Sequence, residues 1–280
     1  MTVGSTRVSQ TWLALREQAD AAARATDLVE RLARQLPATG ERVIHDLGCG
    51  SGAMGRWLAP LLPGPQRWIL HDRDADLLRI AARDLPAGAS DGARVTVETR
   101  ESDITRLSPG ELAGATVITA SALLDLLTGD ELARLVATCV GAWCPVLLTL
   151  SVVGRVELAP SDPLDPRVAA AFDDHQRRQT AGGRLLGPDA VTVAIEELRR
   201  LGAEVVVRPS PWRLAAAQAE LAAEWLDGWV DAACAQEPEL ALVAGEYASR
   251  RRAQAVAGEL AVTVEHADVL VLPRADRVAG

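Results

Sequence analysis

Short apolar stretches alternate with segments of helical periodicity along most of the chain. The apolar stretches predict β-strands at residues 42–47, 67–71, 94–99, 116–120, 144–153, 204–208 and 268–273. The segments between them predict helices. This alternation is typical of a mostly parallel sheet with helices on both faces and right-handed crossovers. We therefore expect a doubly wound α/β fold with a seven-stranded sheet.

Three regions depart from this alternation. Residues 11–36 are rich in alanine and carry apolar positions at helical spacing, so residues 1–40 predict an N-terminal helical cap. Within the predicted core of residues 41–213, residues 154–187 combine proline, glycine and charge, and so long a stretch predicts a lid or substrate insertion. Residues 214–280 predict a helical excursion followed by the last strand of the same domain.

The composition predicts a soluble globular protein. Hydrophobic residues make up 49% of the 280 residues, which is enough for a substantial core. The sequence contains no apolar run as long as a membrane-spanning helix, and its first ten residues lack the basic and apolar regions of a secretory signal. We expect a cytoplasmic protein whose four cysteines are reduced, buried small residues.

The charge and the cysteine spacing restrict the partners. The net charge of −9 repels polyanions, so we expect a small-molecule partner and no nucleic acid or membrane. The cysteine spacing matches no structural zinc site, and no metal is expected. Either a monomer or a homodimer is compatible with the sequence.

The segment VIHDLGCGSGAMG, residues 43–55, carries the clearest chemical signal. Its strand ends in Asp46, and Gly48, Gly50 and Gly52 follow, a pattern that resembles motif I of class I S-adenosylmethionine-dependent methyltransferases. Glycines permit positive φ and close approach of the backbone to a ligand. The resemblance implies that the acid faces the cationic amino group of the methionine part, and that Cys49 and the three glycines also contact the cofactor.

Two later segments resemble further motifs of the same family. Asp72 follows the second predicted strand, where relatives place an acid that accepts hydrogen bonds from both ribose hydroxyls, a task suited to two carboxylate oxygens. Arg73 is adjacent and is implied as a further contact. Asp103 and Ile104 follow the third strand, where the family holds the adenine ring and its amino group. The resemblance thus implies four more cofactor contacts.

The segment VITASALLDLL, residues 117–127, resembles the family's fourth strand and the turn beside the transferred methyl group. The resemblance implies that Thr119, Ala120 and Ser121 line the cofactor edge. Many relatives carry two histidines at the positions of Leu124 and Asp125, so this chain departs from them. Asp125 is our catalytic candidate there, and His175 in the predicted lid is the second.

The acceptor site is predicted from aromatic and cationic side chains outside these motifs. Residues four apart share a helix face, which places Trp12 and Arg16 together on the N-terminal helix. Arginines form bidentate hydrogen bonds with anionic groups, which makes Arg177 and Arg178 candidates for an anionic acceptor. Trp212 is a candidate for an aromatic wall over the substrate.

The resemblance covers about residues 40–210 and implies a Rossmann-like fold with S-adenosylmethionine as cofactor. The implied activity is methyl transfer to an unidentified small-molecule oxygen, nitrogen or carbon nucleophile. Gly50, Gly52 and Gly55 also satisfy the dinucleotide pattern G-x-G-x-x-G, so an NAD(P)-dependent oxidoreductase is one alternative. A non-catalytic, cofactor-binding partner subunit is another. Asp46 favours methyl transfer because a phosphate site has no use for an acid.

Overall fold

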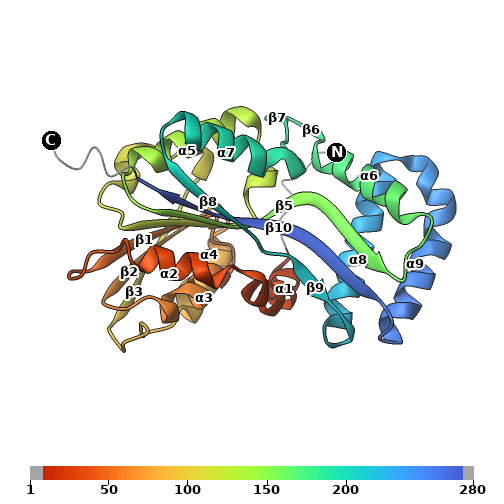
Figure 1. The fold of residues 1–280 in the computed structure, drawn as a ribbon, viewed down its shortest axis with the longest axis horizontal. Helices are drawn as coiled ribbons and strands as arrows, with labels where there is room; N and C mark the ends of the chain where they lie inside the picture. Colours follow the sequence, from red (N-terminus) through yellow and green to blue (C-terminus); the bar gives the residue numbers. More distant parts are fainter. Residues whose placement is uncertain (1–8, 274–280) are drawn as a thin grey trace.

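An eight-stranded sheet forms the centre of the computed structural model, which describes residues 9–273 (Figure 1). The strand order is β3-β2-β1-β4-β5-β10-β8, and β9 also pairs with β10. Residues 1–8 of the predicted cap and residues 274–280 of the predicted C-terminal segment lie outside this description.

Among the described strands of this sheet, β10 alone runs opposite to the others. Parallel pairs join β1 (Arg42–Leu47), β2 (Gln66–Asp72), β3 (Val95–Glu101), β4 (Val117–Ser121) and β5 (Val146–Ala159). Antiparallel pairs join β10 (Ala261–Leu272) to β5, β8 (Glu204–Pro209) and β9 (Trp212–Leu214). The predicted fold class is confirmed. All seven predicted strands exist, whereas the three-residue β9 escaped prediction.

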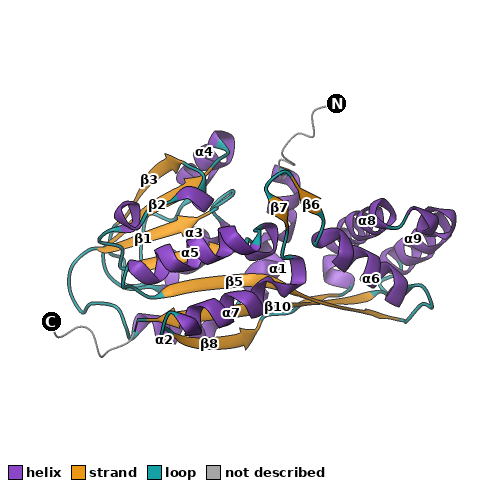
Figure 2. Ribbon diagram, turned by 90° about the horizontal axis from the view of Figure 1, so that it is seen from above, coloured by secondary structure: helices purple, strands orange, loops and turns teal. Residues whose placement is uncertain are grey.

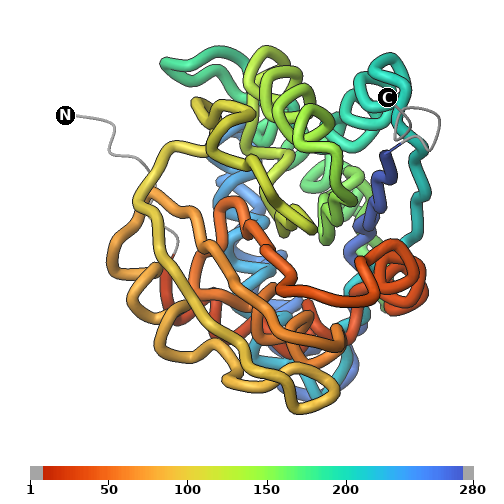
Figure 3. The backbone as a smooth tube through the Cα atoms, turned by 90° about the vertical axis from the view of Figure 1, so that its left-hand side faces the viewer, coloured from red at the N-terminus to blue at the C-terminus, as the bar shows by residue number. Residues whose placement is uncertain are grey.

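Helices cover both faces of the sheet. One face carries α2 (Thr26–Ala33), α3 (Ala53–Leu58) and α4 (Ala75–Asp84), and the other carries α5 (Gly129–Gly141) and α7 (Ala190–Arg200). Seen end-on, the red and orange helices lie on one side of the sheet and the green and teal ones on the other (Figure 3). Apolar side chains on both faces explain why the inner strands read as continuous hydrophobic runs.

Strands β5 and β10 extend well beyond the rest of the sheet. They contain 14 and 12 residues, against five to seven in β1 to β4. Their projecting ends pair with each other and carry α6 (Asp165–Gln176), α8 (Ala219–Gln236) and α9 (Ala241–Val256), as Figure 2 shows. A separate hydrophobic core lies between these arms and helices, so this extension packs around its own interior.

The extension changes the interpretation of residues 154–187. We expected a lid or substrate insertion, and the segment holds the end of β5, helix α6 and a hairpin of β6 (Gln179–Thr180) and β7 (Gly183–Arg184). Strand β5 continues into this segment because apolar and charged residues alternate at period two through Leu158, with the apolar set facing inward. Val168 and Ala171 then bury α6 in the core of the extension.

Two further expectations concern cysteines and membrane spans. Cys49, Cys139 and Cys144 are buried as predicted, but Cys234 is only half-buried, because it lies on a less covered side of α8. Within residues 9–273, the structure contains no helix long and apolar enough to cross a membrane.

Candidate functional site

A cavity of about 730 Å³ lies at the carboxyl ends of β1, β2 and β4, where β5 and β10 continue into the extension. Its volume is within the range of small-molecule sites. Open α/β sheets bind ligands at this end. We call the part lined by Arg24, by the ends of β1 to β4 and by the segments after these strands the loop side. The part lined by α1 (Gln10–Ala23), α6, α8, β9 and the arms is the aromatic side.

The glycine turn forms the floor of the loop side. Gly50 has a φ of +55° and lines the cavity, a conformation that a residue with a side chain rarely adopts. Gly48 lines it as well, together with Cys49. Gly52 was predicted to contact the cofactor, but it is not among the described residues that line the cavity. A Cβ on Gly52 would lie 2.9 Å from the Cα of Ala81, so this glycine allows the turn to pack on α4.

Asp46 is the penultimate residue of β1 and lines the cavity. Its side chain is buried, with the residue 1% exposed, and Oδ1 accepts a 2.7 Å hydrogen bond from Oγ1 of Thr119. Among the described residues Oδ2 has no partner. Burial raises the pKa of Asp46 to about 7, because the charged form loses its hydration.

Thr119 and Ala120 were predicted at the cofactor edge, but neither lines the cavity in the described part of the chain. Both are buried inside β4, since side chains at these positions pack within the layers of the sheet. Thr119 instead acts through Asp46, whose carboxylate it orients. Ser121, the last residue of β4, does line the cavity.

Arg24 is a site residue that the sequence did not reveal. It caps the C-terminal end of α1, is buried and lines the cavity. Its Nη2 donates a 3.2 Å hydrogen bond to Oγ of Ser121, whereas Nε and Nη1 find no acceptor within residues 9–273. Burial lowers the pKa of this guanidinium, and Asp20, Asp268 and Asp46 oppose that effect.

Asp72 joins the end of β2 to the glycine turn. Its Oδ2 accepts a 2.8 Å hydrogen bond from the amide of Gly50, and its Oδ1 accepts a 2.9 Å bond from the amide of Asp74. A carboxylate oxygen can accept two hydrogen bonds, so one position on each oxygen remains for a ligand. Asp72 and the adjacent Arg73 both line the cavity.

Asp103 and Ile104 lie further along the loop side and line the cavity. Asp103 caps a short 3₁₀ helix and accepts hydrogen bonds from the amide of Thr105 at 3.0 Å and from its hydroxyl at 2.7 Å. Its side chain is half exposed. Ile104 is buried beside it. The local turn therefore fixes Asp103 in place.

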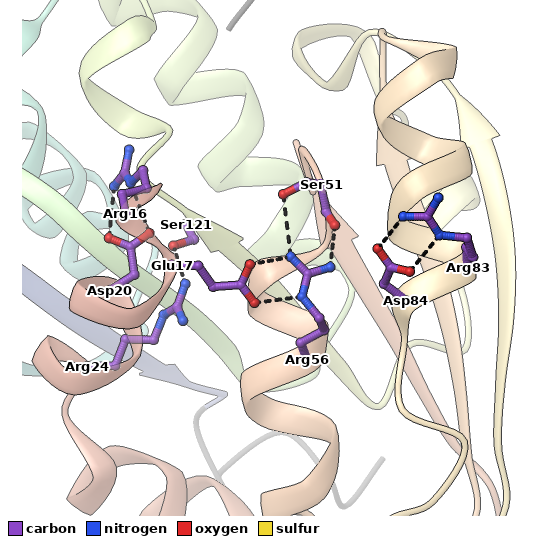
Figure 4. Close-up of polar contacts among 9 residues, drawn as sticks. All are labelled: Arg16, Glu17, Asp20, Arg24, Ser51, Arg56, Arg83, Asp84 and Ser121. Atoms are coloured by element: carbon purple, nitrogen blue, oxygen red, sulfur yellow. Dashed lines mark hydrogen bonds and ion pairs between the residues drawn. The ribbon is translucent and has the colours of Figure 1, made fainter. Parts of the chain in front are cut away.

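Helix α1 closes over the glycine turn. Glu17 accepts two hydrogen bonds of 2.6 Å from Arg56 of α3, whose Nη1 also donates to the carbonyl oxygen of Ser51 (Figure 4). On the cavity side of the same helix, Arg16 pairs with Asp20 at 2.9 Å. These contacts hold one face of α1 against the loop side.

The aromatic side brings distant residues together. Trp12 and Trp212 were predicted as substrate contacts, and both line the cavity, with ring centroids 6.2 Å apart. Arg16 also lines it and stacks 5.0 Å from the ring of Trp212, whose Nε1 donates a 3.0 Å hydrogen bond to Asp20. Phe172 and Trp225 complete the aromatic lining.

The candidate catalytic residues differ in position. Asp125 lines the cavity just after β4, and burial raises the pKa of its carboxyl. His175 lies on α6 but is not among the described residues that line the cavity. On that helix Phe172 and Gln176 face the cavity instead, because residues four apart share a face.

Arg177 and Arg178, our candidates for binding an anionic acceptor, do not line the cavity in the described structure. Arg177 is occupied by an ion pair with Asp189, in which Nε lies 2.6 Å from Oδ2. Arg178 donates a 3.2 Å hydrogen bond to the backbone carbonyl of His175. Contact of either arginine with the acceptor therefore stays a prediction that the lining of the cavity does not support.

His266 was overlooked in the sequence because it precedes the predicted strand of residues 268–273, whereas β10 already begins at Ala261. It is buried, lines the cavity and lies 5.4 Å from the ring of Trp212. Burial and the nearby Arg16 lower its pKa to about 4, so the imidazole is neutral at physiological pH.

Several solved structures resemble this chain. The cyclopropane synthase MmaA2 from Mycobacterium tuberculosis superposes with a TM-score of 0.50 at 14% identity, over 94% of either chain. The YcgJ protein from Bacillus subtilis gives 0.49 at 12% identity, over 89% of this chain and 99% of the other. Magnesium protoporphyrin IX methyltransferase (ChlM) from Synechocystis PCC 6803 gives 0.43 at 13%, over 75% and 84%.

The superposition with the cyclopropane synthase, together with the strand order, shows that the chain has the fold of class I S-adenosylmethionine-dependent methyltransferases. No protein-family model matches the sequence, and the search of curated proteins also finds no match. Across residues 9–273, the structure brings together no group of three His, Cys, Asp or Glu side chains that could hold a metal ion.

Proposed function

We propose that this protein transfers the methyl group of S-adenosylmethionine to a small-molecule nucleophile. The proposal rests on two buried residues of the loop side, Asp46 and Arg24, each of which has side-chain atoms without a hydrogen-bond partner in the described structure. Asp46 offers an acceptor oxygen, and Arg24 offers donors that have no other acceptor in the described structure. A buried charge needs a partner, and both groups border the same cavity.

This pair matches the charges of an α-amino acid. An ammonium suits Oδ2 of Asp46, and a carboxylate suits the planar donors of Arg24. The methionine part of S-adenosylmethionine carries both groups. NAD(P) instead presents phosphates to a glycine turn, and the carboxylate of Asp46 would repel them. The loop side therefore favours the methyl donor over the dinucleotide.

The rest of the loop side fits the nucleoside. The free acceptor positions of Asp72 suit the ribose hydroxyls, and Asp103 with the buried Ile104 suits the adenine ring. The cofactor supplies an electrophilic methyl group on a sulfonium. The chain's own residues would align the two reactants and exclude water, and Asp125 is the candidate for orienting the acceptor or taking its proton.

A small-molecule acceptor is favoured by the enclosure and by the charge. Residues of the extension line the cavity on the side away from the loops, which limits the size of an acceptor. The net charge of −9 disfavours binding of a nucleic acid. The acceptor would enter the aromatic side, next to the cofactor in the same 730 Å³ space.

Isothermal titration calorimetry separates the two cofactors. We expect S-adenosylhomocysteine, the product of methyl transfer, to bind with a Kd on the order of 1–10 μM, and NAD⁺ to show no saturable heat. Arg83→Met is a matched control variant, because Arg83 pairs with Asp84 on the surface of α4, outside the cavity (Figure 4). Saturable binding of NAD⁺ without binding of S-adenosylhomocysteine would establish the dinucleotide alternative instead.

A further inference from the structure

We propose that the methyl acceptor is an uncharged, planar aromatic compound that carries a hydroxyl or amino hydrogen, and that Gln176 and His266 are its polar contacts. The inference rests on the proposed function, because it assigns the aromatic side of the cavity to the acceptor. It goes beyond that function by naming the chemical class of the acceptor and the residues that recognise it.

Aromatic residues are concentrated at this one site. The chain contains nine Phe, Tyr and Trp residues, and four of them line the cavity: Trp12, Phe172, Trp212 and Trp225. They come from α1, α6, β9 and α8, segments far apart in sequence. In a chain with so few aromatic residues, this convergence favours a ligand that offers flat apolar faces for stacking or edge contacts.

The aromatic faces are held in fixed positions. The indole of Trp212 donates to Asp20 at 3.0 Å and is covered by Arg16 on one side and approached by His266 on another. Trp225 stacks on Trp229, with ring centroids 5.1 Å apart and planes 21° apart. A rigid, preformed surface loses little conformational entropy when a ligand binds.

Aliphatic side chains fill the wall between these rings. Val152 and Val156 of β5 point inward by the two-residue period of a strand, and Val264 of β10 lies on the facing arm. A mainly apolar lining with few polar groups is the usual composition of a site for an apolar small molecule. The arms therefore supply apolar contacts rather than hydrogen bonds to sugars or phosphates.

The charge balance of the aromatic side argues against an anionic acceptor. Arg16 is neutralised by Asp20, to which it donates from both Nε and Nη2, at 2.9 and 3.2 Å. His266 is neutral at physiological pH. Among the described residues that line the aromatic side, no cation lacks an acidic partner. An anion would lose its hydration there without gaining a counter-charge.

Two buried polar atoms are left for the ligand: the amide oxygen of Gln176 requires a donor, and the imidazole nitrogen of His266 can accept or donate according to its tautomer. Oε1 of Gln176 and Nδ1 of His266 have no hydrogen-bond partner in the described part of the chain, and both residues line the cavity. An amide oxygen only accepts hydrogen bonds, and it is destabilising when it is buried unpaired. A hydroxyl or amino group on the ligand would satisfy it, whereas an ether or hydrocarbon would not.

The test is binding of a matched panel, measured by calorimetry with and without saturating S-adenosylhomocysteine. The panel contains phenol and 2-naphthol, the saturated alcohols cyclohexanol and 2-decalol, and the anions benzoate and 2-naphthoate. We expect at least one hydroxyarene to bind about 10-fold more tightly than its saturated and anionic counterparts. Gln176→Leu and Trp212→Leu should each weaken that binding about 10-fold and leave the Kd of S-adenosylhomocysteine unchanged.

Trp143→Leu is the control variant, because Trp143 is 52% exposed and lies outside the cavity. Gln176→Leu keeps the test valid if Trp212→Leu fails to fold. Equal binding of aromatic and saturated alcohols, or tighter binding of the anions, would overturn the inference while S-adenosylhomocysteine still binds. Failure of S-adenosylhomocysteine to bind would instead overturn the proposed function, and the panel on the free protein would still report on the aromatic side.

Discussion

Thr119 donates a 2.7 Å hydrogen bond to Oδ1 of Asp46, while Oδ2 of the same carboxylate is buried with no partner among the described residues. The hydroxyl of Thr119 fixes the orientation of the carboxylate but leaves Oδ2 without a hydrogen bond. Burial raises the pKa of Asp46 to about 7, so a large share of the free protein holds this group protonated at neutral pH. A bound ammonium would favour the charged form and expel the proton.

Cofactor binding is therefore expected to release a proton from Asp46. Below its pKa of about 7 the free protein holds the proton, and the bound form needs the carboxylate. Calorimetry in two buffers of different ionisation enthalpy should show release of nearly one proton at about pH 6, and little release at about pH 8, where Asp46 is already ionised. Asp46→Asn should remove the pH-dependent release. The same release from the variant would show that another group titrates.

Arg24→Met is expected to weaken the binding of S-adenosylhomocysteine without affecting that of 5′-methylthioadenosine, which lacks the amino-acid part. Removal of a buried, charge-assisted contact costs about 2 kcal/mol or more, which corresponds to roughly 30-fold in Kd. Competition titrations with the two ligands measure the difference. Equal losses for both ligands would place Arg24 away from the methionine carboxylate, and Arg83→Met should change neither Kd.

Asp72→Asn is expected to weaken both ligands alike, because both contain the ribose. Asparagine keeps one acceptor oxygen and loses the negative charge, so the loss is about 2 kcal/mol for either ligand. The amide of Gly50 also depends on Asp72, and circular dichroism should confirm that the variant is folded. A loss confined to S-adenosylhomocysteine would mean that Asp72 does not contact the ribose.

The loop side was largely predictable, because its contacts depend on residues next to the glycine turn. An acid near the end of a strand, followed by closely spaced glycines, restricts the conformation of the turn. Asp46, Gly50 and Asp72 line the cavity, in line with the sequence pattern. The exceptions follow from burial: Gly52 packs on α4, and Thr119 lies inside β4. Local sequence does not report which side of a turn faces the ligand.

The aromatic side was only partly predictable. His266 lies in an ordinary strand pattern, just as Arg24 of the loop side lies at an ordinary helix end, and only the tertiary fold brings either residue to the cavity. The composition of residues 154–187 suggested a loop, but long-range pairing of β5 with β10 overrode that local tendency. Trp12 and Trp212 are 200 positions apart, and no short-range periodicity relates them.

A buried histidine pair predicts sensitivity to acid. Nδ1 of His45 and Nε2 of His71 lie 3.0 Å apart, and burial lowers the pKa of both residues to about 4. Their unfolded pKa is about 6.5, so the stability from the neutral pair is complete above that pH and is lost as the pH falls towards 4.

Urea unfolding should therefore show that the free energy of unfolding falls between about pH 6.5 and 4.5, by about 2 kcal/mol or more for each of the two histidines. His71→Asn should flatten this part of the profile, and subtraction of the two profiles removes the contribution of carboxylates. An unchanged slope in the variant would show that the pair does not control the acid response.

The most direct test of the central claim is a crystal structure of the protein with S-adenosylhomocysteine. We expect the methionine ammonium to lie about 3 Å from Oδ2 of Asp46 and the methionine carboxylate to accept hydrogen bonds from Arg24. The thioether sulfur should face the aromatic side. A bound nucleoside elsewhere on the protein, or a methionine part that contacts neither Asp46 nor Arg24, would contradict the account.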